Sequence, residues 1–157
     1  MQQKSYTVHS PQEMGALAEQ IAAHVRVRDV ILLKGDLGTG KSTFARALIQ
    51  ALCGKTTEVP SPTFTLVQTY EAPLFILWHF DLYRLKEESE IYELGIEEAY
   101  ESGVSLIEWP ERLGTLLPRH YFEIEFDYGH DECERILIFR GGSQEIPQGW
   151  LPEGAGA

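Results

Sequence analysis

A phosphate-binding pattern, Gly-x-x-x-x-Gly-Lys-Ser, occupies residues 35–42 of the 157-residue chain. Residues 30–33 before it form an apolar run typical of a buried strand, and residues 44–52 after it repeat apolar side chains at helical spacing. In such a loop the glycines let successive backbone N–H groups surround a phosphate, and the following helix adds the positive end of its dipole. The motif in this context predicts a nucleotide-binding α/β domain rather than an ordinary glycine-rich turn.

The side chains of this loop have predicted tasks of their own. Lys41 supplies a cation to the β- and γ-phosphates, and Ser42 offers its hydroxyl to Mg²⁺. The predicted nucleotide-binding residues of the loop are Gly35, Gly38, Thr39, Gly40, Lys41, Ser42 and Thr43. We therefore expect a nucleotide together with Mg²⁺ as the ligand.

Charge and composition narrow the class of protein. The chain has 13 basic and 24 acidic residues, a net charge of -11, so a broad direct contact with nucleic acid is not expected. Cys53 and Cys133 show no zinc-binding spacing and are expected to be free thiols in a reducing compartment. The N-terminal residues lack a hydrophobic signal segment, and the longest apolar stretch, residues 74–78, is too short to span a bilayer. We expect a cytoplasmic protein without membrane contact.

The order of the predicted elements indicates a mixed sheet. Strands are expected at 6–8, 30–33, 64–70, 74–80, 104–107, 121–127 and 135–140. Only residues 71–73 separate the third strand from the fourth, too few for a parallel crossover, so these two should form an antiparallel hairpin. Helices are expected after a cap at Ser10, after the phosphate loop, and within 87–101, where Gly95 interrupts the helix. We predict one P-loop NTPase domain over residues 1–140, a three-layer α/β sandwich with a mixed parallel and antiparallel central sheet, and a flexible Gly- and Pro-rich tail over 141–157.

Two apolar strands each end in an acidic residue. Asp81 follows the run at 74–80, and Glu108 follows the run at 104–107. Ligands of open α/β sheets gather at the carboxyl ends of the parallel strands, so these carboxylates are candidates to hold Mg²⁺ and to orient a nucleophile. Such acids also occur as ordinary turn or helix-cap residues. The hairpin leaves open whether the Asp81 strand ends on the same side as the phosphate loop.

Several other features each have two interpretations. The Pro-Ser-Pro-Thr segment at 60–63 is either a γ-phosphate-sensing switch or a proline-stiffened turn. Trp109 either serves the site or packs in the core. Residues 87–101, with seven glutamates and no Lys or Arg, form either a solvated helical face or a docking surface for a basic partner. The five histidines show no metal-binding spacing and are expected to be ordinary surface or core residues.

Four segments together resemble the signatures of the TsaE family, the bacterial tRNA threonylcarbamoyladenosine biosynthesis ATPases. They are GDLGTGKST at 35–43, SPTFTLV at 61–67, HFDLYR at 79–84 and IEW at 107–109. Their order and spacing also agree with the family, and the resemblance extends over roughly residues 6–140. The combination is more specific than the phosphate loop alone.

The resemblance implies an Mg²⁺-dependent ATPase with ATP as its nucleotide. It implies that the protein acts with the partner proteins TsaB and TsaD, supports repeated transfer of threonylcarbamoyl onto tRNA, and meets tRNA only indirectly. We expect slow hydrolysis by the chain alone, because a domain this small offers an incomplete clamp for the transition state.

The resemblance also implies roles for single residues. Lys41 is implied to bind the phosphates, and Ser42 and Glu108 are implied to hold Mg²⁺. The residues implied to be required for activity are Thr43, Asp81 and Trp109. Ser10 and Arg135 resemble positions that flank the adenine. Ser42 stands where the family often has threonine, and either hydroxyl can serve.

Other functions stay open at this point. A small-molecule kinase also combines a phosphate loop with a short chain, but it needs a lid that excludes water, and only Arg112 and Arg119 are basic between residues 87 and 131. A non-catalytic assembly factor gated by nucleotide would need ATP binding alone. A GTPase is disfavoured, because the chain contains no asparagine and so lacks the Asn-Lys-x-Asp motif that reads guanine.

Overall fold

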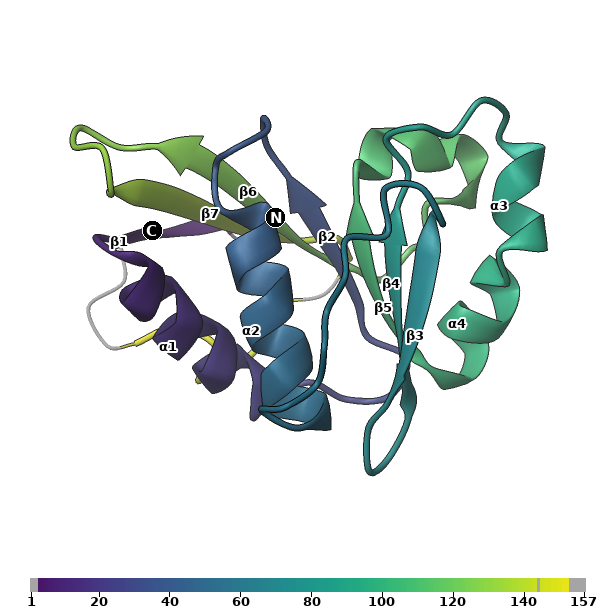
Figure 1. Cartoon of the computed structure of the whole chain (residues 1–157), viewed down its shortest axis with the longest axis horizontal. Helices are drawn as coiled ribbons and strands as arrows, with labels where there is room; N and C mark the ends of the chain where they lie inside the picture. Colours follow the sequence, from purple (N-terminus) through teal and green to yellow (C-terminus); the bar gives the residue numbers. More distant parts are fainter. Residues whose placement is uncertain (1–2, 144, 153–157) are drawn as a thin grey trace.

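The computed structural model describes residues 3–143 and 145–152, and its centre is a seven-stranded sheet in the order β1-β7-β6-β2-β5-β4-β3 (Figure 1). The strands are β1 Gln3–Val8, β2 Val30–Lys34, β3 Val67–Glu71, β4 Ile76–Asp81, β5 Val104–Glu108, β6 Phe122–Tyr128 and β7 Arg135–Gly141. The helices are α1 Pro11–Ala22, α2 Lys41–Cys53, α3 Ser89–Glu93, α4 Ile96–Ser102 and the 3-10 helix η1 Pro110–Leu116.

The sheet is parallel in its middle and antiparallel at its two sides. Strands β6, β2, β5 and β4 run parallel to one another. Strands β1, β7 and β6 form an antiparallel run at one side, and the β3–β4 hairpin closes the other side. The predicted mixed sheet and the predicted hairpin are both confirmed.

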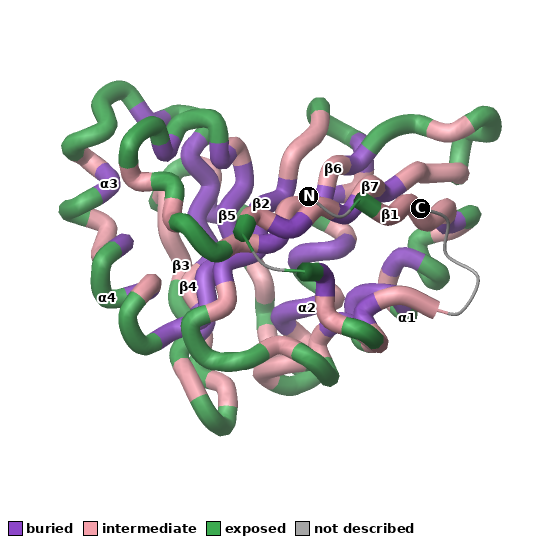
Figure 2. Tube along the Cα trace, turned by 180° about the vertical axis from the view of Figure 1, so that it is seen from behind, coloured by how far each residue is buried: buried purple, intermediate pink, exposed green. Residues whose placement is uncertain are grey.

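Helices cover both faces of this sheet (Figure 1). The strand β2 shows why, because its side chains alternate between two cores: Ile31 and Leu33 pack on the side of α1 and α2, whereas Val30 and Leu32 pack on the side of α4. A strand buried on both faces requires the continuous apolar sequence that β2 has. Figure 2 shows the buried residues along the central strands, between the helical layers. Among the described residues, no helix has the length and apolar character needed to cross a membrane.

The segment before β3 differs from the prediction. A strand was expected from residue 64, but β3 begins at Val67. Residues 62–66 form a turn instead, in which Leu66 N donates to Pro62 O at 2.6 Å and Leu66 has a φ of 67°. The predicted start of this strand is therefore wrong, because the backbone folds back on Pro62 before it becomes extended.

The chain after β7 packs against the domain where the structure describes it. Ile146 and Trp150 are buried in the core on the side of α1 and α2. The Trp150 ring lies 4.6 Å from the Phe122 ring, measured between centroids, and Gln20 of α1 donates to the Gly149 carbonyl at 2.8 Å. This part of the expected flexible tail thus contributes to the fold, because the indole adds a large apolar surface to the core. Residues 144 and 153–157 of that tail lie outside the described residues.

Candidate functional site

The phosphate loop has a backbone that only glycines adopt without strain. Gly35, Gly38 and Gly40 have φ values of 141°, 81° and 105°. A Cβ atom on Gly35 would lie 2.6 Å from the Phe126 carbonyl oxygen, so β6 also requires glycine there. Inside the loop, the buried Thr39 hydroxyl donates to the Asp36 carbonyl at 2.6 Å. The loop is therefore held in one shape by its neighbours and by its own hydrogen bonds.

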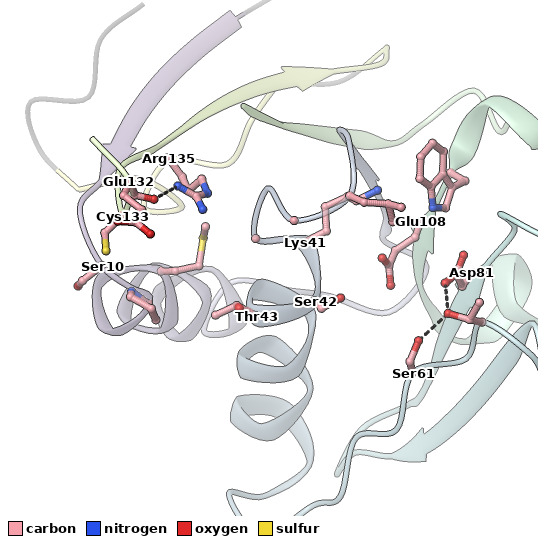
Figure 3. A pocket seen from close by; sticks show the side chains of 17 residues that line it. Ser10, Lys41, Ser42, Thr43, Ser61, Asp81, Glu108, Glu132, Cys133 and Arg135 are labelled. Atoms are coloured by element: carbon pink, nitrogen blue, oxygen red, sulfur yellow. Dashed lines mark hydrogen bonds between the residues drawn. The ribbon is translucent and has the colours of Figure 1, made fainter. Parts of the chain in front are cut away.

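This loop forms one wall of a pocket with a volume of about 460 Å³ (Figure 3). The other walls come from the start of α1, the segment before β3, the ends of β4 and β5, and the β6–β7 turn. The predicted site residues that line it are Ser10, Gly38, Gly40, Lys41, Ser42, Thr43, Asp81, Glu108, Trp109 and Arg135. Gly35 and Thr39 are absent from the described lining. Instead they fix the shape of the loop, Gly35 through its backbone angles and Thr39 through its hydrogen bond to Asp36.

Lys41 is the central cation of the pocket. Only 5% of the residue is exposed, and within the described part of the chain its Nζ atom has no hydrogen-bond partner. Burial lowers the pKa of Lys41, while the nearby carboxylates of Glu108 and Asp81 act in the opposite direction. A buried ammonium group without hydrogen bonds is costly. An anion with several oxygens in the pocket would remove this cost.

Trp109 lies directly against this lysine. The Lys41 Nζ atom is 4.0 Å from the centroid of the Trp109 ring, which is close enough for a cation–π contact. Trp109 has left-handed backbone angles, with φ at 60° and ψ at 54°, which cost a non-glycine residue roughly 1–2 kcal/mol. The Tyr83 ring also contacts the Trp109 ring, with 4.9 Å between the two ring centroids. The site thus holds an unfavourable backbone conformation that brings an aromatic ring onto the lysine.

The two strand-end acids meet at one edge of the sheet. Asp81 stands opposite Glu108 in the register of the parallel pair β4 and β5, and β5 is also parallel to β2. All three strands therefore end on the side of the phosphate loop, which answers the question that the hairpin left open. Both acids are 6% exposed and line the pocket beside Lys41. They add negative charge where a metal ion and a nucleophile would meet a bound phosphate.

Both oxygens of the Asp81 carboxylate accept hydrogen bonds. Thr63 Oγ1 donates to Oδ2 at 3.0 Å, and Tyr83 N donates to Oδ1 at 3.1 Å. Thr63 Oγ1 also lies 2.7 Å from Ser61 Oγ, so the Pro-Ser-Pro-Thr segment is joined to the acid through its hydroxyls (Figure 3). The sequence singled out this segment but did not predict its contact with Asp81.

Glu108 has a partner that sequence reasoning missed. His79 Nε2 lies 2.7 Å from Glu108 Oε2, and both side chains are almost fully buried. His79 had been expected to be an ordinary histidine. The sequence contained a signal that His79 lies near the acids. Residues two apart on a strand point to the same face, so His79 lies on the same face of β4 as Asp81.

The opposite end of the pocket is formed by α1 and the β6–β7 turn. Ser10 Oγ accepts a hydrogen bond from Glu13 N at 3.1 Å, which confirms the predicted cap of α1. Arg135 Nη1 donates to the carbonyls of Glu132 and Glu134 at 2.7 and 2.9 Å. The two residues that resembled adenine-flanking positions therefore line the pocket while their polar atoms also serve local structure.

Comparison with known proteins gives consistent matches over most of the chain. The family model described as threonylcarbamoyl adenosine biosynthesis protein TsaE matches residues 8–137. A tRNA threonylcarbamoyladenosine biosynthesis protein TsaE from Rickettsia conorii is 43% identical over 143 residues, which cover 89% of this chain and 82% of the relative. The protein of the same name from Bacillus subtilis is 37% identical over 140 residues, covering 88% and 86%. The crystal structure of Bacillus subtilis YdiB aligns with a TM-score of 0.75 at 29% identity, covering 90% of this chain and 87% of that one.

Proposed function

Because the chain belongs to the TsaE family of threonylcarbamoyl adenosine biosynthesis proteins, we propose that it binds and hydrolyses ATP in the formation of threonylcarbamoyladenosine in tRNA. One observation carries this proposal. Lys41, Asp81 and Glu108 converge beside the phosphate loop, all nearly buried, at the carboxyl ends of parallel strands. A cation for phosphates and two carboxylates for metal and water are the groups that phosphoryl transfer to water needs.

The residues of the loop fit a triphosphate. The backbone N–H groups at the start of α2 and the dipole of that helix favour a phosphate group. The Lys41 ammonium, which lacks a hydrogen-bond partner in the described structure, would donate to phosphate oxygens, and the Thr43 hydroxyl lines the same wall. The absence of asparagine, and hence of a guanine-reading motif, favours adenine as the base.

Ser42 and Glu108 are the residues that would hold Mg²⁺. Both line the pocket, and a hydroxyl with a carboxylate matches the oxygen ligands that this ion takes beside phosphate groups. When bound, Mg²⁺ would neutralise charge that develops on the phosphate oxygens. The chain contributes by keeping the Glu108 carboxylate buried and oriented before the nucleotide arrives.

Asp81 and Trp109 would complete the reaction. The Asp81 carboxylate accepts a proton from, and orients, the water that attacks the terminal phosphate. It can do so by exchanging the hydrogen bond from Thr63 for one from the water, while Tyr83 N keeps the carboxylate in place. Trp109 keeps the Lys41 ammonium directed into the pocket through its ring.

The proposal includes TsaB and TsaD as protein partners. The net charge of -11 favours contact with proteins over direct contact with tRNA, which would then be held by those partners. We expect slow hydrolysis by the purified chain and faster hydrolysis with the partners present. The ATPase would support repeated rounds of tRNA modification rather than carry out the modification itself.

A reconstituted reaction tests this function. The purified chain is added with ATP and Mg²⁺ to TsaB, TsaD and unmodified tRNA, and threonylcarbamoyladenosine is measured over time. Product beyond one turnover, lost when the chain or Mg²⁺ is left out, would support the proposal. Phosphorylation of a small-molecule acceptor without any effect on tRNA modification would favour a kinase instead.

A second candidate function is assembly gated by nucleotide binding, without a need for hydrolysis. It is favoured by the contact between Thr63 and Asp81, because a bound nucleotide could rearrange the segment around Thr63 without any chemical step. Asp81→Ala separates the two functions. We expect it to lower hydrolysis about 100-fold and tRNA modification in parallel, with ATP affinity within about threefold of wild type. Full tRNA modification by this hydrolysis-deficient variant would show that binding alone is sufficient.

A further inference from the structure

A buried hydrogen bond joins the Glu108 carboxylate of the pocket to His79, which is not among the described residues that line the pocket. His79 Nε2 lies 2.7 Å from Glu108 Oε2, and the side chains are 4% and 8% exposed. Since a carboxylate accepts hydrogen bonds, the imidazole carries a proton on Nε2, and this N–H group donates the hydrogen bond. The other ring nitrogen, Nδ1, is buried and has no hydrogen-bond partner in the described part of the chain. A tautomer with its proton on Nε2 leaves no N–H group unsatisfied.

The position of this histidine is fixed by the sheet. His79 and Asp81 share one face of β4, and β4 pairs with β5 so that Asp81 stands opposite Glu108. The imidazole therefore lies one step deeper in the sheet than the two acids. Its backbone belongs to a strand with paired neighbours on both sides, so the donor itself is held firmly.

Glu108 needs such a support. A glutamate has several rotatable bonds, and holding its carboxylate in one place costs conformational entropy. Among the described residues, the bond from His79 is the one hydrogen bond that the Glu108 carboxylate receives. It engages Oε2 and leaves Oε1 available, and the carboxylate points into the pocket (Figure 3).

We propose that His79 is a positioning residue that holds the Glu108 carboxylate in the orientation needed to bind Mg²⁺ with the nucleotide. This inference rests on the proposed function, in which Glu108 is a metal ligand. Hydrogen-bond donors behind a metal ligand commonly change metal affinity by roughly 10–100-fold when they are removed. His79 thus sets how much Mg²⁺ the protein requires, without touching metal or nucleotide itself.

The test compares the metal requirement of variants in the full chain. His79→Leu and His79→Ala remove the donor, whereas His79→Gln keeps an N–H group near the position of Nε2. Leu77→Ala is the matched control, because Leu77 is fully buried two residues earlier on the same strand and face. Binding of a non-hydrolysable ATP analogue is measured by calorimetry in EDTA and during Mg²⁺ titration, and thermal unfolding is recorded for every variant.

We expect the donor-free variants to raise the half-saturating Mg²⁺ concentration about 10-fold or more, with affinity in EDTA within about twofold of wild type. His79→Gln should return the Mg²⁺ requirement to within about threefold of wild type. Leu77→Ala should lower thermal stability and leave the Mg²⁺ requirement unchanged. A donor-free variant that loses only thermal stability would make His79 a packing residue and overturn the inference, and so would failure of the glutamine to restore metal affinity.

Glu108→Ala separates failure of this inference from failure of the proposed function. If Glu108→Ala raises the Mg²⁺ requirement and the donor-free His79 variants do not, only the positioning role is overturned. If Glu108→Ala leaves the Mg²⁺ requirement unchanged, the metal assignment in the proposed function is wrong, and the role of His79 falls with it.

Discussion

The two ends of the pocket are built in different ways. At the phosphate end, Lys41, Asp81 and Glu108 are each no more than 6% exposed, and the Lys41 ammonium has no hydrogen-bond partner in the described structure. At the other end, Ser10 caps α1 and Arg135 binds the carbonyls of the β6–β7 turn. The cation at the phosphate end thus has no hydrogen bond among the described residues, whereas the side chains of Ser10 and Arg135 at the other end are already hydrogen-bonded.

This difference predicts separate roles for the two ends of the pocket. Buried polar groups held for a ligand interact strongly with it, because little water screens them. Groups that already stabilise a helix start or a turn gain less from a new partner. We therefore expect the phosphate end to decide whether the nucleotide binds and reacts, and the other end to provide mainly a surface against the base.

The largest effect should come from Lys41→Met, which keeps the length of the side chain and removes its charge. We expect nucleotide affinity to fall about 100-fold, because charge-assisted hydrogen bonds to phosphate are lost. Calorimetric titration with ADP and with an ATP analogue measures the change. A loss of less than threefold, with the protein folded, would mean that the phosphate end does not dominate binding.

A smaller effect is expected from Trp109→Leu. A desolvated cation–π contact contributes up to about 2 kcal/mol, so the loss of the ring should lower the kcat/KM of ATP hydrolysis roughly 10-fold. Trp109→Phe keeps an aromatic face and should remain within about threefold of wild type. Equal losses in both variants would show that the ring acts through packing rather than through the Lys41 ammonium.

At the other end, Ser10→Ala should affect stability and leave nucleotide binding nearly unchanged. Removing a helix cap costs about 1 kcal/mol, which corresponds to a decrease of roughly 2–4 °C in the unfolding temperature for a protein of this size. Differential scanning calorimetry measures the decrease, and titration with ADP should give an affinity within about threefold of wild type. A loss of affinity comparable to that of Lys41→Met would remove the distinction between the two ends.

The smallest expected effect is a pH dependence of stability at the phosphate end. Burial lowers the pKa of Lys41 below the ordinary value of 10.5, so between these two values the unfolded chain binds more protons at this site than the folded chain. The resulting loss of stability is full below the lowered pKa of the folded state and is relieved as the pH rises from there toward 10.5. The unfolding free energy of wild type should therefore rise relative to that of Lys41→Met as the pH approaches 10.5 from below. The free energies of unfolding are measured in urea at each pH. If they change with pH by the same amount in the two proteins, the lowered pKa of Lys41 is wrong.

Sequence reasoning predicted most of the fold because the signals are local. The apolar run of β2, the phosphate loop and the Ser10 cap each occupy a short continuous segment, and each was predicted correctly in kind. Where the chain departs from its local pattern, the prediction was weaker. Leu66 turns back on Pro62 instead of extending into β3, and Trp150 joins the core although its neighbours are rich in Gly and Pro.

The candidate site was predictable only in part. Lys41 and Ser42 belong to a motif of consecutive residues, so their neighbourhood could be read from the chain itself. The contacts of Asp81 with Thr63, and of Glu108 with His79, join segments that are distant in sequence. Such pairs depend on strand order and register, which no local pattern reports.

By itself, the sequence predicted a phosphate-binding loop and, through its four signatures, the family to which the chain belongs. That information is local, since a phosphate loop is formed by consecutive backbone groups and the start of one helix. Only the tertiary structure decided that Asp81 and Glu108 meet at the edge of the sheet where the phosphate loop lies, and that His79 lies behind Glu108. The physical reason is the parallel register of β4 and β5, which aligns residues from separate segments and buries them together beside Lys41.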